Sequence, residues 1–101
     1  MNYTQIGDWK IPALIAGGLA RYTLGNVRPG SGLHAILRGD LFEAIACCDP
    51  ETTAHISNIV RVIAGYAPSA SWGSSSTVDR WIRNDDNWTS EQVSDRHRKI
   101  W

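Results

Sequence analysis

Residues 28–48, RPGSGLHAILRGDLFEAIACC, carry the signal that decides the fold. From residue 33 onward, apolar side chains recur every three or four positions, which is the spacing of one helical face. The polar residues between them fall largely off this face. The pattern predicts one continuous helix that begins near Ser31 or Gly32 and buries a stripe formed by Leu33, Ile36, Leu37, Leu41, Ala44, Ile45 and Cys48.

Helices are also predicted on both sides of this stretch. Upstream, Pro12 suits the first position of a helix and Gly25 suits its C-cap. Downstream, Asp49 suits the cap and Pro50 the first turn of a third helix, which ends before Pro68.

The remaining segments complete an all-α fold. A short fourth helix is expected over 78–82, with Ser75 or Ser76 as its cap. Thr89 and Gln92 resemble the capping box of a last helix. No β-strand alternation of useful length appears, so the sequence predicts a compact bundle of four helices plus a short C-terminal helix or tail.

Length and composition limit the possible partners. The chain has 101 residues, with ten basic and ten acidic ones, so we expect a helical domain at 1–83 and a linker with a C-terminal helical extension at 84–101. The balanced charge argues against nucleic acid as a partner.

Cys47 and Cys48 are adjacent and no CxxC pair exists, so neither a disulfide nor a metal site is predicted. No signal-like or membrane-spanning run is seen, which predicts a cytoplasmic protein without membrane contact, in the host cytoplasm if a phage encodes it.

The start of the central helix is a candidate anion site. Backbone N–H groups at a helix start lack partners and lie at the positive end of the helix dipole. Gly30, Ser31 and Gly32 would supply such groups, and Arg28 would add a charged arm. The alternative is a tight turn between helices, with a positive φ at Gly30 or Gly32.

A similar opening precedes the fourth helix at Trp72, Gly73 and Ser74. Trp72 could stack on a purine while Ser74 bonds phosphate or ribose; alternatively, Trp72 pins the loop to the core. His34 and Arg38 lie one helical turn apart and could face the same ligand. The predicted ligand-binding set is therefore Arg28, Gly30, Ser31, Gly32, His34, Arg38, Trp72, Gly73 and Ser74.

Catalysis finds little support in the sequence. The chain has no nucleophile elbow, no His-x-x-x-His pair and no carboxylate dyad with an obvious partner. We therefore expect a protein that is not an enzyme and that needs no catalytic residue, metal or cofactor.

The run GNVRPGSGLHAILRGDLFEAIACCDPET resembles a pattern in small all-helical proteins of phages and prophages. The resemblance covers about residues 11–82 and departs from that pattern at Ser31-Gly32, where Gly-Phe is usual, and at Gly39, where Asn is usual. It implies a phage-like origin, a helical fold and a role in manipulating the host. The matching residues are Arg21-Tyr22, Pro29-Gly30, Leu33, Ala35-Ile36-Leu37, Asp40-Leu41, Asp49, Ile59-Val60, Pro68, Trp72-Gly73-Ser74, Val78 and Trp81.

Two functions from different classes follow. In the first, a non-enzymatic counter-defence protein sequesters a small phosphate-bearing nucleotide, such as a cyclic oligonucleotide or an ADP-ribose derivative, between two converging glycine-serine openings. In the second, the protein inhibits a host defence complex, such as a CRISPR effector, by protein–protein contact. A helix-turn-helix regulator is disfavoured because no basic recognition helix is present. Trp88 and Trp101 favour docking onto a second surface, so we expect a homo-oligomer.

Overall fold

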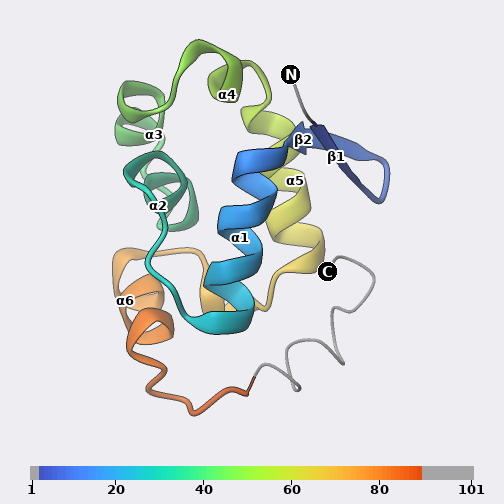
Figure 1. Ribbon diagram of the computed structural model, residues 1–101. Helices are drawn as coiled ribbons and strands as arrows, with labels where there is room; N and C mark the ends of the chain where they lie inside the picture. The colour runs from blue at the N-terminus through green and yellow to red at the C-terminus, as the bar shows by residue number, and fades with distance from the viewer. Residues whose placement is uncertain (1–2, 90–101) are drawn as a thin grey trace.

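The computed structural model describes residues 3–89, which form a mainly helical unit with a small hairpin at its N-terminal end (Figure 1). The predicted last helix after Thr89, and Trp101 with it, lie outside the described residues. The elements are β1 (Tyr3–Ile6), β2 (Trp9–Pro12), α1 (Ala13–Gly25), α2 (Ser31–Leu37), α3 (Leu41–Cys47), α4 (Pro50–Ala54), α5 (Ile56–Tyr66), the short 3-10 helix η1 (Ser69–Ser71) and α6 (Ser75–Arg83).

The hairpin corrects the expectation that the fold contains no strands. β1 and β2 pair antiparallel, with Ile6 opposite Trp9 and a turn that holds Gly7 at a φ of 59°. Each strand has only four residues, too few for a period of two to stand out in the sequence. Pro12, the predicted first residue of the helix, instead ends β2 and occupies the N-cap of α1, so the helix begins one residue later, at Ala13.

The predicted central helix is wrong as a single element, because it breaks at Gly39. Gly39 has a φ of 81°, and its N–H donates to the carbonyl of Ile36, which closes α2. Asp40 then caps α3, since its carboxylate accepts the N–H of Glu43 at 3.0 Å. A glycine that ends one helix and an aspartate that starts the next explain why the chain turns at this point.

The predicted third helix is also two helices, α4 and α5, which meet at His55. The predicted start of α4 is confirmed: Pro50 opens the helix, and the Asp49 carboxylate accepts the N–H of Thr52 at 2.7 Å. The structure therefore has six α-helices and a two-stranded sheet over residues 3–89, where the sequence predicted four helices and a tail.

Two helix caps lie one residue away from their predicted positions. Asn26, in the left-handed conformation, is the C-cap of α1, and Gly25 is the last helical residue. Ser74 caps α6, where Ser75 or Ser76 was expected.

The core forms around α1, which Figure 1 shows at the centre, with α2 and α3 on one side and α5 on the other. Tyr22 is fully buried, and its hydroxyl donates to the carbonyl of Ser71 at 2.6 Å. The Trp81 indole N–H donates to the carbonyl of Tyr22 at 2.8 Å. These two bonds join α1 to η1 and to α6, so the polar atoms of both buried aromatic side chains are satisfied.

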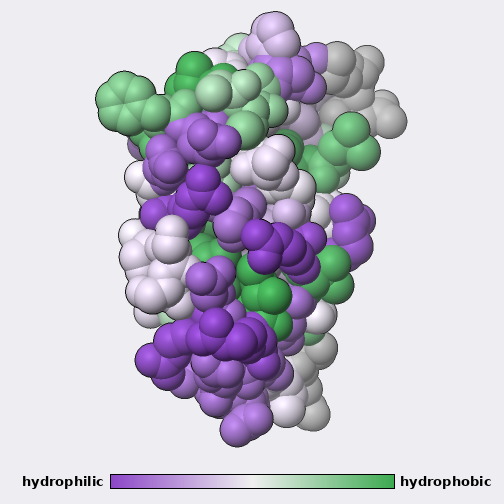
Figure 2. All heavy atoms as spheres, turned by 90° about the vertical axis from the view of Figure 1, so that its left-hand side faces the viewer, coloured by the Kyte–Doolittle hydropathy of each residue, from purple (hydrophilic) through white to green (hydrophobic). Residues whose placement is uncertain are grey.

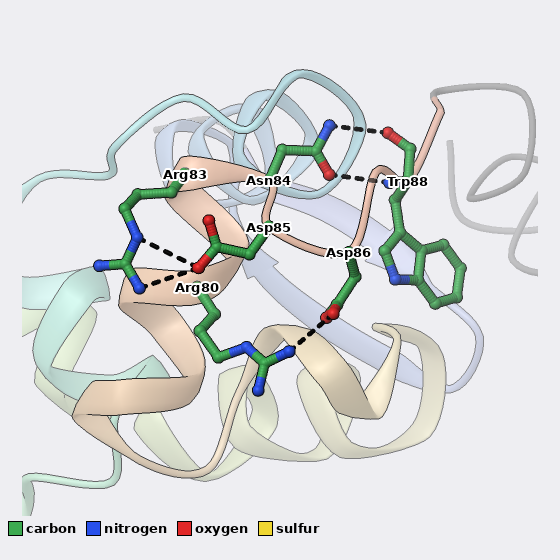
Figure 3. A network of polar contacts seen from close by, with 6 residues as sticks. All are labelled: Arg80, Arg83, Asn84, Asp85, Asp86 and Trp88. Carbon is green, nitrogen blue, oxygen red and sulfur yellow. Dashed lines mark hydrogen bonds and ion pairs between the residues drawn. The ribbon is translucent and has the colours of Figure 1, made fainter.

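The segment after α6 is tied to that helix (Figure 3). Asn84 exchanges two hydrogen bonds with the backbone of Trp88, at 2.8 and 2.9 Å, and the Trp88 ring lies 5.4 Å from that of Trp81. Ion pairs join Arg80 to Asp86 and Arg83 to Asp85. The boundary at residue 83 stays a prediction, because most of the expected extension lies outside the described residues.

Over residues 3–89, none of the helices combines the length and the apolar character that crossing a membrane requires.

Candidate functional site

Helix α3 is apolar and almost entirely exposed. Of its seven residues, Ala44 alone is buried. Phe42 is 89 % exposed, Leu41 62 % and Ile45 45 %. A helix that is apolar on most sides normally lies inside a protein, so this exposure requires an explanation.

A neighbouring residue on α5 extends the exposed apolar surface. Val60 is 48 % exposed, and we call Leu41, Phe42, Ile45 and Val60 together the apolar face. Figure 2 shows one group of apolar side chains on the upper part of the molecule, at the height of α3, further apolar ones at mid-height, and a hydrophilic region at the bottom, at the height of α6. Contiguous exposed apolar surface on a small protein marks a binding site more often than scattered apolar residues do.

A groove of about 670 Å³ runs between α3 and α5. Leu41 and Ala44 line its α3 wall, and Ile56 and Val60 line its α5 wall. Ile36 and Leu37 of α2, together with Trp72 and Gly73, also line it. The walls offer apolar side chains one helical turn apart, which is the arrangement that receives an apolar helix.

The sequence prediction missed this surface because it placed Leu41 and Ile45 in a buried stripe. After the break at Gly39, α3 follows a new direction, and the two side chains point outward. Phe42 was the available signal, since a large aromatic residue off the predicted stripe has no place in the core of a single helix.

Charged groups stand at the edges of the apolar face. Asp40 lies 3.5 Å from the Arg38 guanidinium. Arg61 of α5 lines the groove and is held over the Trp9 ring at 4.7 Å. Glu43 of α3 is exposed, and its carboxylate accepts a hydrogen bond from the Cys47 thiol at 3.0 Å.

The predicted amides at Gly30–Gly32 lie at the N-terminal end of α2. They border a separate hollow of about 260 Å³, which Arg21 and Asp49 also line and to which Arg28 does not contribute. The alternative of a positive φ at Gly30 or Gly32 is wrong: Gly30 has a φ of −62°, and Gly32 is absent from the positive-φ glycines of residues 3–89. Gly32 is needed for another reason, since a Cβ there would lie 2.7 Å from the Cys48 sulfur.

His34 and Arg38 are in contact, as a shared ligand would require, and Arg28 is near enough to act electrostatically on His34. Arg38 donates to His34 Nδ1 at 2.7 Å, so the neutral ring carries its proton on Nε2. That Nε2 is buried and has no hydrogen-bond partner among the described residues. Burial, and then the charges of Arg28 and Arg38, hold the pKa of His34 below its ordinary value, against an opposing effect of Asp79.

Trp72, Gly73 and Ser74 already have structural roles. The Trp72 indole N–H donates to the Ala67 carbonyl at 3.3 Å. The Gly73 N–H donates to the Leu37 carbonyl at 2.8 Å, and Ser74 caps α6. The Gly73 bond holds this segment at the C-terminal end of α2, about 10 Å of helix from Gly30. The two glycine-serine openings therefore border different hollows.

Cys47 and Cys48 are free cysteines. The carboxylate of Glu43 raises the pKa of the Cys47 thiol, and burial raises that of Cys48, so both are held as thiols at neutral pH. In the part of the chain that the structure describes, no cluster of three His, Cys, Asp or Glu side chains could hold a metal ion.

Comparisons with known proteins give no further guide: the chain matches no protein-family model, and neither a curated protein nor a solved structure is detectably similar to it.

Proposed function

We propose that this chain is a non-enzymatic protein-binding domain that inhibits its target by direct contact through the apolar face. The observation that carries the proposal is the 89 % exposure of Phe42 on a helix that buries only Ala44. Burial of a large apolar side chain contributes about 1.5–3 kcal/mol, and each 1.4 kcal/mol corresponds to about tenfold in affinity. Phe42 alone can therefore supply roughly ten- to a hundredfold in binding.

The charge of α3 supports a protein target over a nucleic acid. Three residues join α2 to α3, which is the turn length of a helix-turn-helix, whose second helix would enter the major groove of DNA. Here that second helix contains Glu43 and no Lys or Arg. Phosphate contacts need basic side chains, whereas an apolar helix suits a partner with its own apolar surface.

The resemblance to phage proteins supports a host target. A phage inhibitor would act in the host cytoplasm, and a host defence complex such as a CRISPR effector is the expected class of target. The neutral net charge suits a target recognised by shape and apolar burial.

The test is capture by the immobilised full chain, with two matched variants. Phe42→Glu places a charge on the apolar face, and Leu14→Glu places one at an equally exposed position on α1, since Leu14 is 88 % exposed. We expect a defined host protein that binds the wild type and Leu14→Glu in a 1:1 ratio and is lost with Phe42→Glu. Equal binding by both variants, or no host protein bound, contradicts the proposal.

A second candidate function, nucleotide sequestration, is favoured by one observation. The guanidinium groups of Arg28 and Arg38 and the unpartnered Nε2–H of His34 are hydrogen-bond donors of the kind that hold phosphate. A thermal-shift screen against cyclic oligonucleotides and ADP-ribose isomers tests it, because a ligand of the native state raises stability. We expect a shift that Arg28→Ala abolishes and Arg83→Ala retains; the absence of any shift excludes this candidate.

A further inference from the structure

The groove beside α3 is suited to a two-turn apolar helix. Its α3 wall presents Leu41 and Ala44, three residues apart, and its α5 wall presents Ile56 and Val60, four residues apart. These spacings correspond to about one helical turn. An occupant of matching length needs apolar side chains on more than one side, because it would contact both walls and the floor.

Helix α3 itself has these properties. It has seven residues, about two turns, and it exposes Leu41, Phe42 and Ile45 next to the groove. The protein therefore carries a protruding apolar helix and an apolar groove side by side on one surface. A two-fold axis between them would insert the α3 of each copy into the groove of the other, which is an isologous and closed arrangement.

The helical positions of α3 fit this pairing. Ala44 faces the protein, and Leu41 lies on the groove side. Steps of about 100° per residue then direct Phe42 outward, to the groove floor of the second copy, and Glu43 to the side opposite Leu41. In the two-fold arrangement the groove sides of the two α3 helices face each other. The Glu43 side of each copy consequently faces the α5 wall of the other.

The charges are complementary at that contact. Glu43 is exposed on α3, and the α5 wall of the groove carries Arg61. Each copy would thus bring one carboxylate to the guanidinium of the other, twice per pair. Charge complementarity at the edge of an apolar contact fixes its register.

We propose that the free protein forms a two-fold homodimer in which α3 of each copy fills the α3–α5 groove of the other and Glu43 pairs with Arg61 of the second copy. The pairing needs no host protein and so goes beyond the proposed function. It also covers the apolar face until a target competes for it, which protects a small protein from non-specific association.

Sedimentation velocity of the full chain over a concentration series tests the pairing. We expect the wild type to sediment as a species of twice its chain mass of 11.2 kDa. The Leu14→Glu variant should sediment as the same species. Phe42→Glu should raise the dimer dissociation constant about 100-fold or more. Because Phe42 is 89 % exposed, this variant should keep the circular dichroism spectrum of the wild type, which separates loss of pairing from loss of folding.

A charge exchange identifies the contact. Glu43→Arg and Arg61→Glu should each weaken the homodimer, because like charges then face each other twice. An equimolar mixture of these two variants should form a heterodimer, since both cross-chain contacts again join opposite charges. Mutual rescue in the mixture is a result that a merely structural role of either residue would not produce.

Specific outcomes overturn the inference. A wild type that stays monomeric up to about 1 mM refutes the homodimer, because a dissociation constant above that concentration describes only a weak contact. The refutation holds whether the apolar face is then open or covered by residues 90–101. A dimer unaffected by Phe42→Glu, or no rescue in the mixture, refutes the proposed contact. The proposed function can be refuted separately from the homodimer. If the protein is monomeric and Phe42→Glu abolishes target capture, only the homodimer is refuted. If Phe42→Glu disrupts the dimer and leaves target capture unchanged, only the proposed function is refuted.

Discussion

Replacing Gly39 with alanine should destabilise the protein and disturb the position of α3. Gly39 has a φ of 81°, where an L-residue loses roughly 1–2 kcal/mol relative to a right-handed conformation. A Cβ there would also lie 3.4 Å from the Gly73 carbonyl oxygen, at the edge of ordinary contact. We therefore expect Gly39→Ala to lower the free energy of unfolding by about 1–2 kcal/mol.

Urea denaturation followed by circular dichroism measures this change. With a slope of about 1–3 kcal/mol per molar urea, the midpoint should fall by roughly 0.3–2 M. Gly65 provides the matched control, because it lies inside α5 and a Cβ there would meet no atom within 4 Å. Gly65→Ala should stabilise the protein by up to about 1 kcal/mol. A Gly39→Ala variant as stable as the wild type would refute the break at Gly39 and favour the single long helix.

Three further predictions concern the core and the titrating groups. Tyr22→Phe removes the buried bond to the Ser71 carbonyl and should cost about 1–3 kcal/mol, measured by thermal denaturation. The pKa of His34 is held low by burial and by the charges of Arg28 and Arg38, so Arg28→Ala should raise it in an NMR titration. Because the His34 imidazole binds a proton more readily in the unfolded chain than in the folded one, its contribution to stability should be lost as pH falls below about 6.5. An NMR titration midpoint of His34 that Arg28→Ala leaves unchanged would contradict the assigned cause. The Asp49 cap holds the pKa of its carboxyl down through its backbone hydrogen bond to the first turn of α4. The stabilisation that this cap gives the protein should be present above the ordinary carboxyl pKa, near 3.9, and lost as pH falls through the lower pKa of the folded state. Asp49→Ala should remove this pH dependence from the midpoints of urea denaturation.

The broad helical character of the fold was predictable, but the division of its longest predicted helix was not. Leu37, Leu41 and Ala44 keep a spacing of three and four residues across the break, so the apolar stripe continues in the sequence after the helix has ended. Gly39 and Asp40 were the only local indications, and both also occur inside longer helices. Gly39 adopts its positive φ beside the Gly73 segment, which lies far away in the sequence.

The candidate site shows the same limit. Arg38 reaches His34 and Arg28 affects its charge because all three are near in sequence, so local reasoning could group them. Whether Gly73 approaches Gly30 or Leu37 depends on the path of the chain through α4 and α5. The exposure of Phe42 is likewise a property of the whole fold, since it follows from the direction that α3 takes after the break.

Site-specific photo-cross-linking tests the central claim, that α3 is a binding surface, most directly. A benzophenone amino acid would replace Phe42 in one sample and the equally exposed Leu14 in the other, both in the purified protein and in host cells. We predict adducts from position 42, with a second copy in the purified sample and with a host protein in cells, and none from position 14. No adduct from position 42, or the same adducts from both positions, would contradict the claim.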